Sequence, residues 1–93
     1  GSLQALSALR GLLARELDGL ADEWNDLRGD AATMAGRLHR LRAACGFCGA
    51  RALQSAAEKL SDALRGAAPE RVEETNTEFK RALAATRAAL RRL

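Results

Sequence analysis

Apolar residues recur at spacings of three and four along the first third of the chain: Leu3, Leu6, Leu9, Leu13, Leu17, Leu20, Trp24 and Leu27. This spacing predicts one helix of about 25 residues with a single apolar face. Gly11 and Gly19 interrupt the pattern, and each costs up to ~1 kcal/mol relative to alanine, so the helix has two positions at which a bend or break is tolerated. The run Arg28-Gly29-Asp30 indicates an end and a new start, because glycine suits the position after a helix and aspartate caps the next one.

Three further helices are predicted in the rest of the chain. The second covers about 30–47, with Gly49 as its expected terminator, the third covers 50–66, and the fourth begins at Pro69. Their expected core positions are Met34, Leu38, Leu41, Cys45 and Cys48, then Leu53, Ala57, Leu60 and Leu64, and finally Val72, Phe79, Leu83, Thr86, Leu90 and Leu93. Because short connections make neighbouring helices antiparallel, the expected fold is all-α, an up-down antiparallel four-helix bundle.

The composition favours the same fold class. Alanine, leucine, arginine and glutamate dominate, whereas isoleucine and tyrosine are absent and valine occurs once. Strands prefer β-branched and aromatic residues, so a β-sandwich, a barrel and a Rossmann unit are excluded. A chain of 93 residues is long enough for one small domain. We expect residues 3–93 to form that domain and Gly1-Ser2 to be an expression-tag remnant.

The charge of the chain excludes fewer functions than its composition excludes folds. The chain has 15 basic and 12 acidic residues, a net charge of +3, and its arginines are scattered among acids. A nucleic-acid-binding domain more often gathers its basic residues in one stripe with stacking aromatics, so nucleic-acid binding is the weakest hypothesis carried forward. No apolar run approaches the ~20 residues of a membrane span, and no signal-peptide pattern is present. We expect a monomeric, soluble, cytoplasmic domain excised from a longer chain.

His39 is the only histidine, and its position on the second helix follows from geometry. With His39 set at 0° and about 100° per residue, the core positions of this helix fall between roughly 180° and 260°. His39 is therefore predicted to face solvent. Four small residues lie within about 60° of it on the helix surface, and they are Ala35, Gly36, Ala43 and Gly46. Arg42 follows one turn later, where its guanidinium can reach a group attached to the imidazole.

An exposed imidazole with small neighbours and an arginine nearby is suited to accepting a phosphoryl group. Near neutral pH an exposed imidazole is largely uncharged and carries a free ring nitrogen. Such a ring beside a cation can accept a phosphoryl group, whose negative charge the arginine offsets. The chain has no second histidine or serine-based triad that suggests hydrolysis, so a carrier fits better than an enzyme. The simpler alternative is an ordinary surface histidine on an alanine-rich helix.

The residues around His39 resemble the signature of histidine-containing phosphotransfer domains. The sequence His39-Arg40-Leu41-Arg42-Ala43-Ala44, with Gly49-Ala50 ten and eleven positions after the histidine, is similar to the pattern His-x-Leu-Lys-Gly-Ser/Ala with a later Gly-Ala. Gly29-Asp30 and Leu60 also match in position, so the resemblance covers roughly residues 16–65. Two positions depart from the pattern. Arg42 stands for the lysine, and Ala43 stands for the glycine.

The resemblance implies a phosphocarrier in a multistep two-component phosphorelay. His39 would accept a phosphoryl group from the aspartyl phosphate of one receiver domain and pass it to another, and Arg42 would stabilise it. The chain itself would need no cofactor, because the receiver supplies the Mg²⁺ and the catalytic residues. The receivers would dock on a surface of Ala35, Gly36, Arg40, Ala43 and Gly46. Excision from a longer chain favours a domain of a hybrid sensor histidine kinase, which can be membrane-bound, over a free-standing domain. We expect phosphotransfer to survive the presence of alanine at position 43, because alanine is small. The changes at Arg42 and Ala43 would narrow the choice of receiver partners.

Two other interpretations stay open. The domain can be a helical module that docks receivers or other signalling proteins without being phosphorylated. Cys45 and Cys48 form a C-x-x-C pair that is superficially like a redox motif, but that motif normally follows a strand, and a zinc site needs three or four converging ligands. Because His39 and the cysteines diverge around the helix, we expect no metal site and two small apolar core residues, with redox sensing as the alternative.

Overall fold

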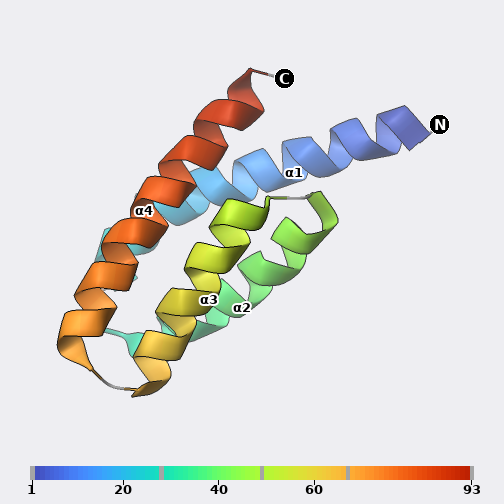
Figure 1. Ribbon diagram of the computed structural model, residues 1–93. Helices are drawn as coiled ribbons and strands as arrows, with labels where there is room; N and C mark the ends of the chain where they lie inside the picture. The colour runs from blue at the N-terminus through green and yellow to red at the C-terminus, as the bar shows by residue number, and fades with distance from the viewer. Residues whose placement is uncertain (1, 28, 49, 67, 93) are drawn as a thin grey trace.

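The computed structural model describes residues 2–27, 29–48, 50–66 and 68–92, with the side chains of 2, 3, 6 and 46–48 outside the description. Every regular element in these ranges is helical (Figure 1), which confirms the all-α fold class. The elements are α1 (Ser2–Glu23), the 3₁₀ helix η1 (Trp24–Leu27), α2 (Ala31–Cys48), α3 (Arg51–Gly66) and α4 (Pro69–Arg91).

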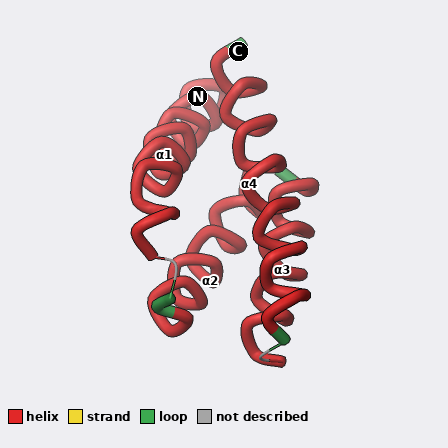
Figure 2. Tube along the Cα trace, turned by 90° about the vertical axis from the view of Figure 1, so that its left-hand side faces the viewer, coloured by secondary structure: helices red, strands yellow, loops and turns green. Residues whose placement is uncertain are grey.

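The helices pack around one elongated core. Helix α2 contacts α1 and α3, and α4 contacts α3 and α1, so each long helix has two helical neighbours (Figure 2). The molecule measures 46 × 19 × 19 Å, because α1 and α4 are longer than α2 and α3. Both chain termini lie at the end where α1 and α4 extend past the shorter pair (Figure 1).

The buried side chains follow the predicted stripes. They include Leu13, Leu17, Leu20, Trp24, Met34, Leu38, Leu41, Cys45, Leu53, Ala57, Leu60, Phe79 and Leu83. Leu27, Leu64, Val72 and Leu90 are half-buried against them. The prediction of Leu9 as a core residue is wrong, because this residue is 40% exposed. The predicted core positions Leu3, Leu6, Cys48 and Leu93 lie outside the described residues or side chains.

Two polar residues complete the core on α4. Thr75 and Asn76 are both buried. The Thr75 hydroxyl donates a hydrogen bond to the Arg71 carbonyl oxygen at 2.7 Å, so its burial leaves no donor unsatisfied. The indole Nε1 of Trp24 donates to Oδ1 of Asn76 at 2.7 Å, which joins η1 to α4 across 52 positions of sequence. The Trp24 ring also packs against Phe79, with ring centroids 4.7 Å apart.

The connection before α2 follows the predicted chemistry. Gly29 has a φ of +94°, a conformation that glycine adopts without steric cost. Asp30 then caps α2, because its Oδ1 accepts a hydrogen bond from the Thr33 backbone N–H at 3.1 Å and its Oδ2 accepts one from the Thr33 hydroxyl at 2.7 Å. These bonds lower the pKa of the Asp30 carboxyl, because they favour its charged form.

Helix boundaries differ from the prediction in small ways. Helix α1 runs unbroken through Gly11 and Gly19 and ends at Glu23, after which the chain tightens into η1. The predicted first helix therefore ends in a 3₁₀ turn, as the last turn of a helix often does. The start of α4 at Pro69 is confirmed. Arg28 and Gly49, which were predicted at helix ends, lie outside the described residues.

Candidate functional site

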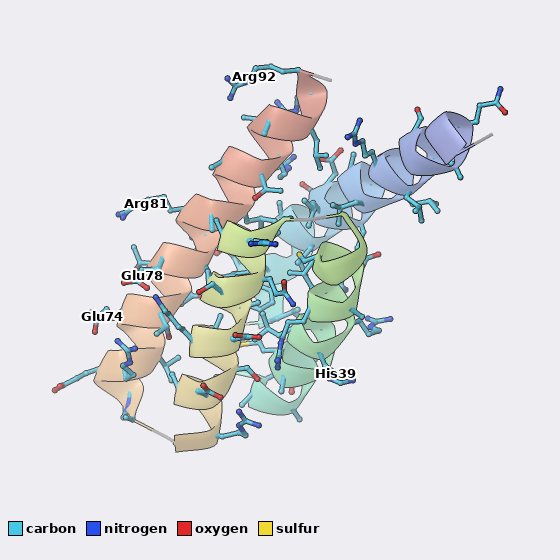
Figure 3. The ribbon with its side chains drawn as sticks, turned by 45° about the vertical axis from the view of Figure 1, so that its right-hand side comes forward. His39, Glu74, Glu78, Arg81 and Arg92 are labelled. Carbon is cyan, nitrogen blue, oxygen red and sulfur yellow. The ribbon has the colours of Figure 1, made fainter. Side chains whose placement is uncertain are left out.

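His39 lies on the outer surface of α2. Its side chain is exposed and points away from α3 and α4 (Figure 3). Leu38 and Leu41, at other angles around the same helix, are fully buried, so the predicted orientation of the helix is confirmed. Within the described part of the chain, no hydrogen bond or ion pair engages the imidazole. The exposed imidazole is therefore accessible to a partner.

The surface beside His39 consists of small residues and is accessible to solvent. Gly36 and Ala43 are exposed, and Ala35 is half-buried. A Cβ built on Gly36 would meet no atom within 4 Å, so nothing in the described structure covers this position. We call Ala35, Gly36, His39 and Ala43 the His39 face. Gly46 belongs to α2, but its exposure lies outside the description.

Arg42 forms one edge of the His39 face. Its Nη2 donates to Oε1 of Glu58 on α3 at 3.1 Å, and its Nε is buried with no hydrogen-bond partner among the described residues. The guanidinium is therefore held toward α3 rather than toward the imidazole one turn away. Sequence reasoning found Arg42 but missed Glu58, because a contact between two helices depends on how each is rotated about its axis.

Arg37 forms the corresponding contact on the other edge of α2. Its Nη1 donates to Oε2 of Glu23, the last residue of α1, at 2.6 Å. Its side chain is mostly buried, and its Nε lacks a hydrogen-bond partner within the described structure. The two arginines thus tie α2 to both of its helical neighbours, with the exposed face between them. Arg40 is exposed beside this face, and no ion pair of the described residues involves it.

Cys45 is separate from this surface. Cys45 is fully buried in the core, as expected for a small apolar residue on the inner stripe of α2. The side chain of Cys48 lies outside the description. Among the described residues, no three His, Cys, Asp or Glu side chains converge in a way that could hold a metal ion.

Comparison with protein-family models, with curated proteins and with solved structures finds no match for this chain. No helix in the described ranges has both the length and the apolar content needed to cross a membrane. The functional assignment therefore depends on the geometry of the site and on the resemblance of its residues. That geometry consists of an exposed nucleophilic ring, small neighbours that leave it accessible, and an arginine one turn away.

Proposed function

We propose that this protein is a phosphocarrier that accepts a phosphoryl group on His39 from the aspartyl phosphate of a receiver domain and passes it to another receiver. The observation that carries the proposal is the exposed imidazole of His39, which no described residue engages, in the middle of a face of small residues. An in-line transfer needs the partner's phosphorylated side chain to approach the ring closely. Long side chains at positions 36 and 43 would prevent that approach.

The transfer needs only the ring on this side. A lone pair of an imidazole nitrogen attacks phosphorus, the new N–P bond forms, and the bond between phosphorus and the aspartyl oxygen breaks, so the carboxylate leaves with the electron pair. The other ring nitrogen keeps its proton. The Mg²⁺ and the remaining charge stabilisation come from the receiver, and this chain acts as a carrier rather than as an enzyme.

The neighbouring residues have defined roles in this proposal. Arg42 offsets the charge of the phosphoryl group, as an arginine can with two parallel hydrogen bonds. Arg40 meets the acidic surface of a receiver, and Ala35, Gly36, Ala43 and Gly46 make the docking floor. The four helices form an up-down antiparallel bundle, a rigid support for the ring, in a cytoplasmic domain.

The second candidate function is a docking module that binds receivers without being phosphorylated. The observation that favours it is the contact between Arg42 and Glu58, which directs the guanidinium away from the imidazole. In that case the His39 face would be a binding surface only.

One experiment separates the two functions. The protein is incubated with a receiver that carries radiolabelled aspartyl phosphate, and acid-labile, alkali-stable label is measured on the wild type and on His39→Gln. The proposed function predicts label on the wild type alone. Stable binding of the receiver without any transfer of label, with several receivers tested, would contradict it and support the docking module.

A further inference from the structure

Charge is distributed unevenly along the molecule. Segments 2–15 and 79–92 together contain seven basic and no acidic residues, whereas segment 16–78 contains eight basic and twelve acidic residues. The first two segments form the beginning of α1 and the end of α4, which lead to the end of the molecule at which both chain termini lie (Figure 1). The net charge of +3 is therefore the balance of a basic end and an acidic remainder.

Two contacts set the register of α4 against α1 and η1. The Nζ of Lys80 donates a hydrogen bond to Oδ1 of Asn25 at 3.3 Å, and the Nε of Arg87 donates one to Oδ1 of Asp18 at 2.8 Å. The second contact lies seven residues later in α4 and seven residues earlier in the partner segment, as antiparallel neighbours require. Continued to the end of α4, this register brings the last turn of α4 level with Arg15 of α1.

Four arginines at this end of the molecule are exposed, and they are Arg10, Arg15, Arg91 and Arg92. The side chain of Arg92 extends outward from the tip of α4 (Figure 3). None of the ion pairs between described residues involves any of the four. The helix dipole favours basic residues in a last turn, which explains Arg91 and Arg92, but its influence falls off within one turn and does not explain Arg10 or Arg15.

Two leucines of α1 are exposed among these arginines. Leu9 is 40% exposed and Leu12 is 57% exposed, and they are the large apolar side chains that the described structure leaves most open to solvent. Spacings of three residues place Leu9, Leu12 and Arg15 in one row on the helix surface. We call the four arginines and the two leucines the basic end.

We propose that the basic end binds the surface of an anionic lipid bilayer. Leu9 and Leu12 enter the boundary between headgroups and acyl chains, and the guanidinium groups bind lipid phosphates. Nucleic acid is also anionic, but it would leave the leucines without an apolar partner. Bases also stack on exposed aromatic side chains, and the described aromatic residues, Trp24 and Phe79, are buried. The combination of charge and apolar surface therefore favours the bilayer.

The basic end is independent of the His39 face. Its residues belong to α1 and α4, whereas the residues of the His39 face belong to α2. Phosphoryl transfer and membrane binding use different surfaces, so the failure of one proposal leaves the other standing.

The test is co-sedimentation of the protein with lipid vesicles. One set of vesicles is phosphatidylcholine alone, and the other is phosphatidylcholine and phosphatidylglycerol in equal parts. We expect binding to the anionic vesicles at about 0.1 M salt, where the Debye length is about 10 Å, and loss of binding at about 1 M salt, where it is about 3 Å. The neutral vesicles should not bind the protein measurably, because two leucines bury little apolar surface without the electrostatic attraction.

Three variants measure the two contributions. Arg91→Gln combined with Arg92→Gln should weaken binding to the anionic vesicles about 25-fold, because each arginine near an anionic surface is worth about fivefold. Arg10→Gln combined with Arg15→Gln should have an effect of similar size. Leu12→Gln should weaken binding about fivefold, because it removes an apolar side chain from the bilayer and leaves the net charge unchanged.

The matched control is Arg65→Gln combined with Arg71→Gln, which removes two exposed charges at the opposite end of a molecule 46 Å long. It should change binding by less than about twofold, because these positions are screened from the membrane surface. Circular dichroism verifies that each variant is helical. Absence of binding to the anionic vesicles at about 0.1 M salt, an equal loss in the control, or unchanged binding of Leu12→Gln would overturn the proposal. Binding to random-sequence duplex DNA but not to the anionic vesicles would also overturn it, in favour of a nucleic-acid surface.

Discussion

The proposed function predicts that Glu58 competes with a phosphoryl group on His39 for Arg42, and this competition can be measured. The side chains of Arg42 and Glu58 are 37% and 47% exposed, so their ion pair is a surface pair worth about 0–1 kcal/mol. Arg42 follows His39 by three residues, which is about 4.5 Å along the helix axis. A phosphoryl group carries a charge of about −1.5 to −2 near neutral pH, more than the single charge of Glu58. Phosphorylation of His39 should therefore draw the guanidinium from α3.

Glu58→Gln removes the competing charge and keeps the shape of the side chain. If Arg42 stabilises the phosphorylated form, its release gains at most the ~1 kcal/mol of the lost pair, a factor of about five. We expect the ratio of label on His39 to label on the receiver at equilibrium to increase up to about fivefold. The free energy of unfolding of the unphosphorylated protein should fall by less than ~1 kcal/mol.

The assay compares labelled protein at equilibrium with one receiver at fixed concentrations. Asp62→Asn is the matched control, because it removes one negative charge from the same helix and its partner is Arg65 rather than Arg42. In an Arg42→Ala background, Glu58→Gln should have no effect, which a double-mutant cycle detects. An increase of the same size in Asp62→Asn, or none in Glu58→Gln, would refute the role assigned to Arg42.

Three further predictions concern the fold. Asn76→Ala leaves the buried indole N–H of Trp24 without its acceptor, so the free energy of unfolding in urea should fall by about 1–3 kcal/mol, and an unchanged midpoint would contradict the Trp24 hydrogen bond. Leu17→Ala should cost about 2–5 kcal/mol because Leu17 is fully buried, whereas Leu12→Ala, at a site 57% exposed, should change stability by less than ~0.5 kcal/mol; equal losses would refute the assigned core. Because Thr33 lowers the pKa of Asp30 below 3.8, the charged carboxylate stabilises the folded state above that pH, and this contribution is lost as the pH falls through the folded-state pKa. Asp30→Asn still caps α2 but does not titrate, so its urea midpoint should decline less steeply below pH 3.8 than that of the wild type.

The fold class and most of the core could be predicted because helical periodicity assigns each residue to a face. In α2 the predicted core positions Met34, Leu38, Leu41 and Cys45 are all buried. In α3 the prediction is right for Leu53, Ala57 and Leu60 but misses the buried Ala56 and Ala63. Leu9 obeys the same spacing but is 40% exposed, because periodicity assigns a residue to a face and does not reveal how much of that face the neighbouring helices cover. Asn76 was missed because it is polar, although it lies four residues after Val72 and three before Phe79. A polar residue inside an apolar stripe was the available signal for the Trp24 hydrogen bond.

Those features of the candidate site that depend on α2 alone were predicted, and those that depend on contacts between helices were not. The exposure of His39 and of its small neighbours follows from the rotation of α2, which its own apolar residues fix. The ion pairs that Arg37 and Arg42 form with Glu23 and Glu58 join different helices. A cavity lined by Met34, Leu64 and Asn76, among others, takes its walls from α2, α3 and α4. Such contacts depend on interhelical packing, which single-helix periodicity does not determine.

The buried residues of α2 fix the rotation of this helix, and so they, and not only the polarity of the imidazole, keep His39 exposed. A rotation of α2 by one residue, about 100°, would in one sense move the imidazole to the buried position of Leu38, and in the other sense move Leu38 to the exposed position of His39. Exposing one buried leucine costs about 1.5–3 kcal/mol, and burying an imidazole without a hydrogen-bond partner is also unfavourable, so a rotation in either sense is opposed. Arg37 and Arg42 oppose the same rotation from the two edges of α2, because each would lose its carboxylate partner. The ring is therefore presented in one fixed direction before any partner arrives, and the ordering of its helix is no longer a cost of binding.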